Sequence, residues 1–178
     1  MQINLASITS LKPVLQLLVA CKKQLHLEGI FQWTEAYPNR GIVEQDILNR
    51  TLYLLLHNEE LVGAISLNRN LEPEYQSIDW EDKNGRALVI HRLAIHPDHQ
   101  GKGYAKSLVQ FAEKLAIEKG FTSVRLDAYS GNGAALRLYE RFCYTKKGTV
   151  TFPGRSLPFF CFEKILRGEH ITELHTLF

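Results

Sequence analysis

A glycine-rich turn between a predicted buried strand and a strongly amphipathic helix is the feature that most constrains how this chain folds. The apolar stretch Arg86–His96 precedes the turn, and a segment with helical periodicity follows it as far as Lys119. The turn itself reads Gln100-Gly101-Lys102-Gly103-Tyr104-Ala105. The first amides of a helix have no intrahelical partner and the helix dipole adds positive potential there, so such a turn is a site for an anion, most often a phosphate. Because glycines let the backbone approach a ligand closely, the turn predicts a phosphorylated cofactor.

The helix after the turn has the clearest periodicity in the chain. Its apolar residues fall on one face, which predicts that this face packs on the sheet. Gly120 stands where a left-handed residue commonly ends such a helix. The apolar face consists of Tyr104, Ala105, Leu108, Phe111, Ala112, Leu115 and Ala116.

Strand-like and helix-like segments alternate through the rest of the chain. The pattern predicts an α/β fold with a mixed sheet, which we expect to form a single domain over residues 1–178. The tail Arg167–Phe178 has no clear pattern. The further predicted strands are Gln2–Ala6, Thr51–His57, Leu61–Asn68, Thr122–Tyr129, Tyr144–Phe152 and Phe159–Leu166. The other predicted helices begin after Thr9 or Ser10, span Ile42–Arg50, and begin after Ser130 or Asn132.

Composition argues against several functional classes. The net charge is only +2, which is too small to indicate a nucleic-acid or membrane partner. The cysteines Cys21, Cys143 and Cys161 form no C-x-x-C pair, so we expect neither a zinc site nor a disulfide framework, and we predict a cytoplasmic compartment. The apolar stretch Leu11–Cys21 carries a lysine and a proline, and it predicts an amphipathic helix rather than a signal peptide.

Two other phosphate-binding patterns do not fit the turn. The Walker A pattern G-x-x-x-x-G-K-[ST] does not occur in the chain. The dinucleotide pattern G-x-G-x-x-G needs a third glycine, which Gly101-Lys102-Gly103 lacks. A simple tight turn without a ligand is the remaining alternative.

Residues 92–105 resemble motif A of the GNAT family of N-acetyltransferases. The core of that motif, R/Q-x-x-G-x-G/A, is matched by Gln100, Gly103 and Ala105. The upstream segment 32–38 is similar to a bacterial subgroup of the same family.

A second family signature lies further along the chain. The pattern N-x-x-A-x-x-x-Y is matched by Asn132, Ala135 and Tyr139. The family usually has Gly-Phe after this helix, whereas this chain has Cys143-Tyr144. Because a left-handed helix end favours glycine, we expect the end of this helix to be reshaped.

The resemblance implies a GNAT-type mixed sheet of about six to seven strands flanked by helices on both faces, and acetyl-CoA as the cofactor without a metal. The amides of the turn would hold the pyrophosphate, and the strand before the turn would bind pantetheine through main-chain hydrogen bonds. The implied cofactor residues are Leu93, Ala94, Ile95, Gln100, Gly101, Lys102, Gly103, Tyr104, Ala105, Asn132 and Ala135.

The resemblance also implies acetyl transfer by direct attack of an amine on the thioester, which needs a proton donor for the thiolate. Tyr139 is the implied donor, because a phenol with a pKa near ~10 can protonate a thiolate whose pKa lies near ~8.5. The alternative for Tyr139 is a core aromatic residue on the apolar face of its helix.

The proton acceptor is harder to identify from the sequence. His91 has a suitable ordinary pKa and is our prediction. It shares strand parity with Val89, Leu93 and Ile95, so a core histidine is the alternative. Other candidates are Glu35, Asp79 and Asp127, or a chain of water molecules.

Aromatic residues in predicted loops suggest where an acceptor binds. We predict that Trp33, Tyr37 and Trp80 line an acceptor pocket, with packing over the first helices as the alternative. The expected acceptor is a small-molecule amine or a peptide amine, and a homodimer is compatible with this interpretation. Two further alternatives are a non-catalytic acyl-CoA-binding or regulatory module and an acyltransferase that uses a longer acyl-CoA.

Overall fold

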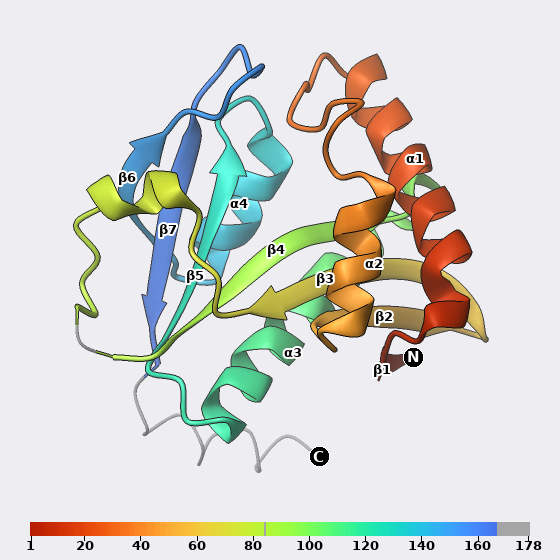
Figure 1. Ribbon diagram of the computed structural model, residues 1–178, viewed down its shortest axis with the longest axis horizontal. Helices are drawn as coiled ribbons and strands as arrows, with labels where there is room; N and C mark the ends of the chain where they lie inside the picture. Colours follow the sequence, from red (N-terminus) through yellow and green to blue (C-terminus); the bar gives the residue numbers. More distant parts are fainter. Residues whose placement is uncertain (84, 167–178) are drawn as a thin grey trace.

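The computed structural model describes residues 1–83 and 85–166, and in it seven strands form one mixed sheet (Figure 1). The predicted fold class is confirmed, whereas the tail Arg167–Phe178 lies outside the described residues. The strand order is β1-β2-β3-β4-β5-β7-β6. The strands are β1 (Gln2–Leu5), β2 (Leu52–His57), β3 (Glu60–Asn68), β4 (Ala87–Ile95), β5 (Ser123–Tyr129), β6 (Thr145–Val150) and β7 (Phe159–Ile165). The helices are α1 (Leu11–Leu27), α2 (Arg40–Leu48), α3 (Tyr104–Glu118) and α4 (Gly133–Arg141), with 3-10 turns η1 (Ile8–Ser10), η2 (Pro73–Ser77) and η3 (Pro97–His99).

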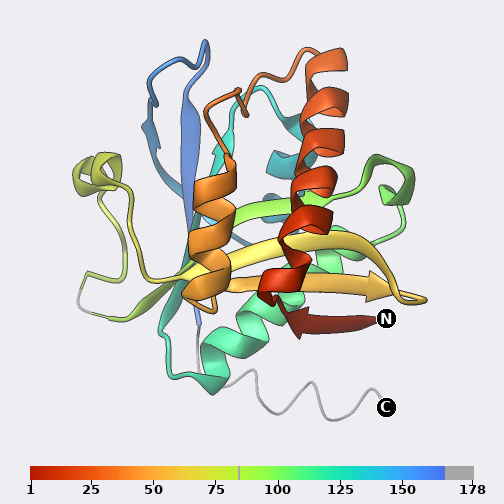
Figure 2. The same cartoon turned by 45° about the vertical axis from the view of Figure 1, so that its right-hand side comes forward.

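Helices cover both faces of the sheet (Figures 1 and 2). On one face Val14 of α1 and Val43 of α2 pack in a cluster with Ala94 of β4. On the other face Leu108 of α3 packs in a second cluster with Ile90 of β4. β4 is therefore buried from both sides, which explains why its sequence is almost continuously apolar.

β4 and β5 separate part of the way along the sheet. They pair in parallel from Ala87 opposite Ser123 to Ile90 opposite Leu126. Both strands continue beyond these pairs, and Figure 1 shows the two ribbons diverging there. The far end of β4 is consequently left without a strand partner on its β5 side.

A bulge in β4 changes which side chains share a face. Arg92 has a φ of 49°, and the register between β3 and β4 shifts at this point. A bulge adds one residue to its strand and so reverses the alternation of faces beyond it. His91 therefore keeps the parity of Val89, whereas Leu93 and Ile95 pack in the α3 cluster on the opposite face. The predicted parity of His91 with Leu93 and Ile95 was wrong because local alternation does not reveal a bulge.

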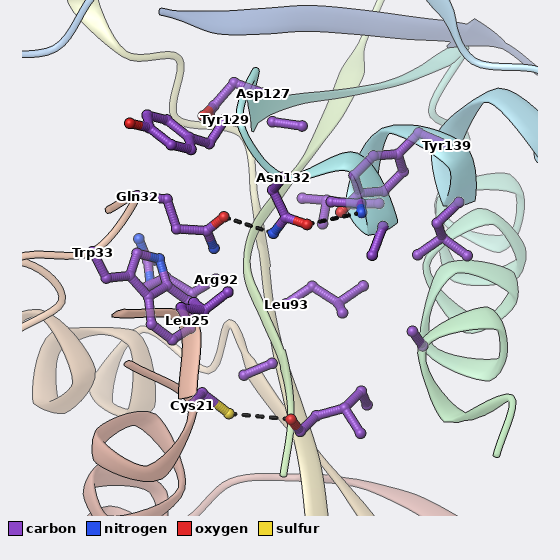
Figure 3. A pocket seen from close by; sticks show the side chains of 18 of the residues that line it. Cys21, Leu25, Gln32, Trp33, Arg92, Leu93, Asp127, Tyr129, Asn132 and Tyr139 are labelled. Atoms are coloured by element: carbon purple, nitrogen blue, oxygen red, sulfur yellow. Dashed lines mark hydrogen bonds between the residues drawn. The ribbon is translucent and has the colours of Figure 1, made fainter. Parts of the chain in front are cut away.

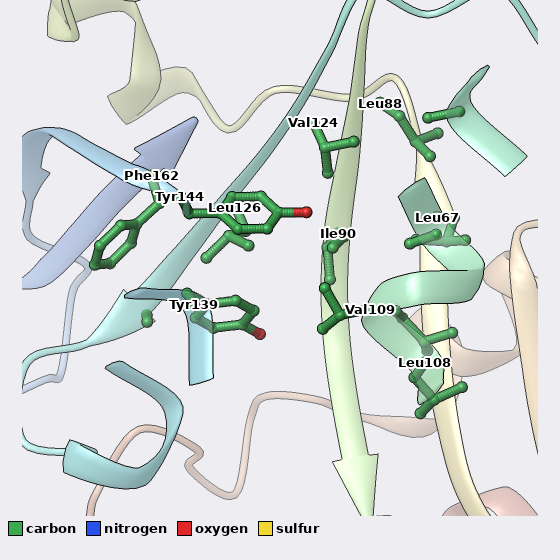
Figure 4. Packing of buried hydrophobic residues seen from close by; sticks show 14 of the residues in the cluster. Leu67, Leu88, Ile90, Leu108, Val109, Val124, Leu126, Tyr139, Tyr144 and Phe162 are labelled. Atoms are coloured by element: carbon green, nitrogen blue, oxygen red, sulfur yellow. The ribbon is translucent and has the colours of Figure 1, made fainter. Parts of the chain in front are cut away.

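The end of α4 is not reshaped, contrary to the expectation from the sequence. Cys143 adopts the left-handed conformation with a φ of 60°, and its N–H donates to the carbonyl of Glu140 over 2.9 Å. The N–H of Tyr144 donates to the carbonyl of Tyr139 over 3.0 Å, which completes a Schellman motif. Figure 4 shows the rings of Tyr139 and Tyr144 packed beside Phe162. The two tyrosine rings thus pack at a helix end where Cys143 has a backbone conformation that residues other than glycine rarely adopt.

Candidate active site

A cavity of about 1130 Å³ opens where β4 and β5 separate. Its lining comes from the ends of both strands, from α3 and α4, and from α1 with the loop that follows it. Figure 3 shows Gln32 and Trp33 on the α1 side of β4 and Tyr139 on α4. The glycine turn and the predicted catalytic tyrosine therefore line the same cavity.

The glycine turn forms one end of this cavity. Gly101 and Gly103 have φ angles of 73° and 84°, and a Cβ on either would meet no atom within 4 Å. Gly103 is the N-cap of α3, so the first amides of that helix are open toward this space. Every residue of the turn lines the cavity except Lys102, whose Nζ donates to the carbonyl of Asp98 over 3.0 Å.

Positive side chains line the same cavity. Lys106 of α3 and Arg137 and Arg141 of α4 line it and are exposed to solvent. Together with the helix N-terminus, they make the cavity suited to a ligand that carries phosphate groups.

The unpaired end of β4 presents backbone groups to the cavity. The N–H of His96 donates to the carbonyl of Val62 on β3 over 2.9 Å. Because successive residues of a strand direct these groups to opposite edges, the backbone groups of Leu93 and Ile95 face the side that β5 has left. Those of Ala94 face β3, where Ala94 pairs with Ala64. The predicted strand addition is thus available through Leu93 and Ile95 and not through Ala94.

The carbonyl of Ile95 already has two donors. Cys21 Sγ donates to it over 3.2 Å and Gln100 Nε2 over 3.3 Å. Burial raises the pKa of the Cys21 thiol to about 12, so the thiol keeps its proton and acts as a donor. These contacts leave the N–H of Ile95 and both backbone groups of Leu93 as the open positions of this edge.

Asn132 and Ala135 occupy the start of α4. The Oδ1 of Asn132 accepts from the N–H of Ala135 over 3.1 Å, which makes Asn132 the N-cap. Its Nδ2 donates to Oε1 of Gln32 over 2.8 Å (Figure 3). Both predicted residues line the cavity, and Asn132 also connects α4 to the loop after α1.

Tyr139 lines the cavity from α4 and is itself buried. Burial and the neighbouring charge of Asp127 raise the pKa of Tyr139 above its ordinary value. A phenol in this environment stays protonated at neutral pH. It can therefore act as a proton donor, and it donates once a base forms next to it.

His91 is buried and lines the cavity. Its Nε2 lies 3.1 Å from Oδ1 of Asn68 and 3.2 Å from the carbonyl of Asn70. The N–H of Asn70 donates to the same Oδ1 over 2.8 Å, which fixes the orientation of the Asn68 amide. Both neighbours of Nε2 are acceptors, so Nε2 carries the proton and Nδ1 a lone pair. Burial, with the nearby charge of Arg92, lowers the pKa of His91 to about 4.

Of the other candidate bases, only Asp127 reaches the cavity. Glu35 forms an exposed ion pair with Lys22 and Asp79 one with Lys83, both outside its lining. The Asp127 carboxylate accepts a hydrogen bond from the hydroxyl of Tyr75. Burial is the main cause that raises the pKa of Asp127 to about 6.

The two predicted acceptor residues before α2 line the cavity. Trp33 is buried in the α1 cluster, and Tyr37 is half-buried. The Tyr37 hydroxyl accepts from Nη1 of Arg92 over 3.1 Å. Arg92 is in turn held by Asp46 of α2 through bonds of 2.8 and 2.9 Å. The bulge residue Arg92 thus fixes the position of Tyr37 at the cavity wall.

The structure separates Trp80 from this site. Its ring packs with Tyr75 in a third cluster, and it is absent from the cavity lining. Arg125 covers the ring at 4.5 Å and forms a buried ion pair of 2.8 Å with Glu163. Trp80 and Arg125 are far apart in the chain, so the sequence gives no local sign of their contact. For this reason Trp80 was wrongly predicted to line the acceptor pocket.

The structure also brings to the cavity residues that the sequence reasoning missed. Glu72, just before η2, places Oε1 4.0 Å from Nδ1 of His91. Arg155 of the β6–β7 loop donates to the carbonyl of Gln32 over 3.1 Å. These residues lie in irregular segments without a motif, and only the fold assembles them.

Comparison with known sequences and structures agrees with this geometry. The sequence model of the acetyltransferase (GNAT) family matches residues 14–143. The chain belongs to the acetyltransferase (GNAT) family. Streptothricin acetyltransferase of Escherichia coli is 31% identical to this GNAT protein over 101 residues, which cover 57% of this chain and 51% of the relative. The chain spans about half the length of the curated relatives it matches.

Solved structures share the fold of this GNAT protein over nearly its whole length. An acetyltransferase of the GNAT family from Streptococcus agalactiae has a TM-score of 0.82 and 25% identity, over 93% of this chain and 95% of the other. The structure of yncA from Salmonella typhimurium with its cofactor acetyl-CoA has a TM-score of 0.70 and 17% identity, over 94% of each chain.

Residues 1–83 and 85–166 show neither a membrane-spanning helix nor a cluster of metal ligands. Their helices include none long and apolar enough to cross a membrane. They contain no group of three or more His, Cys, Asp or Glu side chains arranged to hold a metal ion.

Proposed function

We propose that this GNAT protein transfers an acetyl group from acetyl-CoA to a primary amine. The observation that carries the proposal is one continuous cavity that runs from the glycine turn, along the unpaired edge of β4, to Tyr139. A cofactor for this cavity has phosphates at one end and an extended arm that can add to a strand edge. Acetyl-CoA has both features and supplies an acyl thioester at the end of its arm.

We assign the pyrophosphate to the open amides at Gly101–Ala105. The amide of Gln100, which was expected to take part, instead donates to the carbonyl of Pro97 over 3.2 Å. The charges of Lys106, Arg137 and Arg141 support further phosphate contacts at the same end. Leu93 and Ile95 offer the backbone groups that pair with the arm, while Asn132 and Ala135 form its wall on the α4 side.

Two side chains are placed to move the protons of the reaction. The acceptor enters as an ammonium ion and gives one proton to the Asp127 carboxylate. The resulting amine nitrogen forms a bond to the thioester carbonyl carbon, and the carbon–sulfur bond breaks. Tyr139 donates its proton to the leaving sulfur, and its oxygen recovers a proton from the new amide nitrogen through solvent. Asp127 then releases the proton of the ammonium ion to solvent, which is the one net proton of the reaction.

Asp127 is a better proton acceptor than His91. The pKa of Asp127 is raised to about 6 and that of His91 lowered to about 4, so the carboxylate is the stronger base. General-base efficiency rises as the pKa approaches the operating pH. We therefore assign the role of proton acceptor to Asp127 and a role in binding the amine substrate to His91.

We infer further that residues 1–178 form one catalytic domain that works in the cytoplasm, which the free state of Cys21, Cys143 and Cys161 supports. The acceptor is a small-molecule amine or a peptide amine. A homodimer is compatible with this assignment.

The test is amine-dependent release of CoA. The purified full chain is incubated with acetyl-CoA and a panel of amines, free thiol is measured, and mass spectrometry identifies the acetylated product. We expect thiol release that depends on both the amine and Tyr139, and that disappears in Tyr139→Phe. Tight CoA binding without thiol release for any amine would contradict the catalytic proposal and favour a regulatory acyl-CoA-binding role.

A further inference from the structure

Glu72 and His91 face each other in the cavity without a hydrogen-bond donor between them. The Oε1 of Glu72 and the Nδ1 of His91 are 4.0 Å apart. Both atoms are acceptors, because the ring proton of His91 sits on Nε2. A single nitrogen with two N–H groups fits between acceptors at this spacing, with a bond of ordinary length to each.

The missing donor has to come through the cavity. The side chain of His91 is only 5% exposed, yet His91 lines the cavity. Protonating the ring would supply a donor, but burial and the charge of Arg92 hold the pKa of His91 at about 4. The ring is therefore neutral near neutral pH and keeps its acceptor atom toward Glu72.

The charges around this pair favour a cation. Glu72 and Asp127 both line the cavity, and within residues 1–83 and 85–166 neither has an ion pair with a lysine or an arginine. The guanidinium of Arg92 already has a carboxylate partner, Asp46, at 2.7 Å. That of Arg155 donates to backbone carbonyls rather than to a carboxylate. Carboxylates in a cavity without a positive partner attract a cationic ligand.

Aromatic side chains line the same cavity. A cation gains about 0.5–2 kcal/mol over an aromatic face. The aromatic side chains of the lining include Trp33, Tyr37, Tyr129, Phe152 and Phe159.

We propose that the acceptor carries a second ammonium group besides the amine that is acetylated, and that Glu72 and His91 bind this second group. The inference rests on the proposed acetyl transfer and names its substrate class as a diamine. The second ammonium donates one N–H to Oε1 of Glu72 and another to Nδ1 of His91. The reacting amine then lies next to Asp127, so Glu72 and Asp127 contact different nitrogen atoms of the same substrate.

The test compares linear α,ω-diamines with monoamines of the same chain lengths. We expect kcat/KM for the preferred diamine to exceed that for its monoamine by roughly 10–100-fold, as for a charged hydrogen-bonded contact. Glu72→Gln should remove most of this preference by raising KM for the diamine, with little change for the monoamine. Glu74→Gln is the matched control, because it removes the same charge two residues further along the chain, from a side chain outside the cavity lining.

A binding measurement separates this inference from the proposed function. The diamine is titrated calorimetrically onto the parent and onto Glu72→Gln, each saturated with CoA, so that no turnover is needed. Weaker binding by Glu72→Gln alone supports the inference even if no amine is acetylated. Equal kcat/KM for diamines and monoamines, or equal diamine affinity in parent and variant, overturns the inference and leaves acetyl transfer standing.

Discussion

The backbone N–H of Tyr144 donates a 3.0 Å hydrogen bond to the carbonyl of Tyr139, and the two rings meet edge to face with their centroids 5.8 Å apart. The bond and the ring contact both close the end of α4, the helix that carries the proposed proton donor. Cys143, which directly precedes Tyr144 in the chain, has a φ of 60°, in the left-handed region. The position of Tyr139 therefore depends on a strained helix end that aromatic packing helps to hold.

Replacing this strained cysteine should stabilise the fold. A non-glycine residue in the left-handed region costs roughly 1–2 kcal/mol, and glycine recovers this cost less the extra freedom that it gives the unfolded chain. We expect Cys143→Gly to raise the free energy of unfolding by about 0.5–1 kcal/mol in urea denaturation. Because the side chain is exposed and lies outside the cavity lining, kcat should stay the same.

Cys143→Ala is the matched control, since it removes the thiol but keeps the Cβ that makes a left-handed φ costly. Its stability should remain close to that of the parent. If alanine and glycine stabilised the protein equally, the effect would come from the thiol and not from the backbone.

Tyr139→Phe should separate catalysis from folding. Within residues 1–83 and 85–166 the Tyr139 hydroxyl has no hydrogen-bond partner, whereas its ring packs with Tyr144 and Phe162. Phenylalanine keeps the ring packing, so the melting temperature and the affinity for CoA should hardly change. Loss of the proton donor should lower kcat by roughly 10²–10⁴-fold. An unchanged kcat would return Tyr139 to the role of a core aromatic.

The turn and the elements around it could be predicted from the sequence because their signals are local. The apolar face of α3, its N-terminal glycines and the continuous apolar run of β4 each lie within a short stretch of chain. Asn132 likewise indicates the start of α4, because its side chain caps the helix. Each of these features depends on neighbours within one or two helical turns.

The acceptor end could be predicted only in part: Trp33 and Tyr37 line the cavity as expected, but the rest of this end depends on distant contacts. The bulge at Arg92 arises from pairing with β3, and it puts His91 on a different face from Leu93. Trp80 is held away from the cavity by Arg125, which is itself fixed by strand pairing. Glu72 becomes recognisable only when it meets His91 across the cavity.

Gly103→Val should remove most of the affinity for CoA, and the left-handed φ of 84° at this position should also make the variant less stable. The Cβ at this position points into open space next to the N-terminus of α3, where we place the pyrophosphate. Isothermal titration calorimetry should show that most of the affinity for acetyl-CoA is lost.

Gly29→Val is the matched control for backbone strain. Gly29 has a φ of 75° and equally open surroundings, but it does not line the cavity. Its variant should lose similar stability and keep the parent affinity for acetyl-CoA. Equal affinities in the two variants would mean that the turn does not hold the cofactor.

Asp127 should make folding stability depend on pH in a defined window. Its pKa is about 6 in the folded protein against an ordinary value of 3.8. Between these values the folded state binds more protons than the unfolded state, so this group's contribution to the free energy of unfolding falls as the pH rises from about 4 to about 6. Asp127→Asn should therefore gain stability relative to the parent across this window. A difference that is constant with pH would show that the carboxylate has no raised pKa.

The same carboxylate should set the acid side of the rate profile. Asp127 accepts a proton only when ionised, so kcat/KM for a primary amine should fall as the pH drops below about 6. The acceptor amine also has to lose a proton, which makes the rate rise further toward its own, higher pKa. Asp127→Asn should lower kcat/KM by roughly 10²–10⁴-fold and remove the inflection near 6, leaving that of the amine. If the inflection stayed in Asp127→Asn, another group or a chain of water molecules would be the proton acceptor.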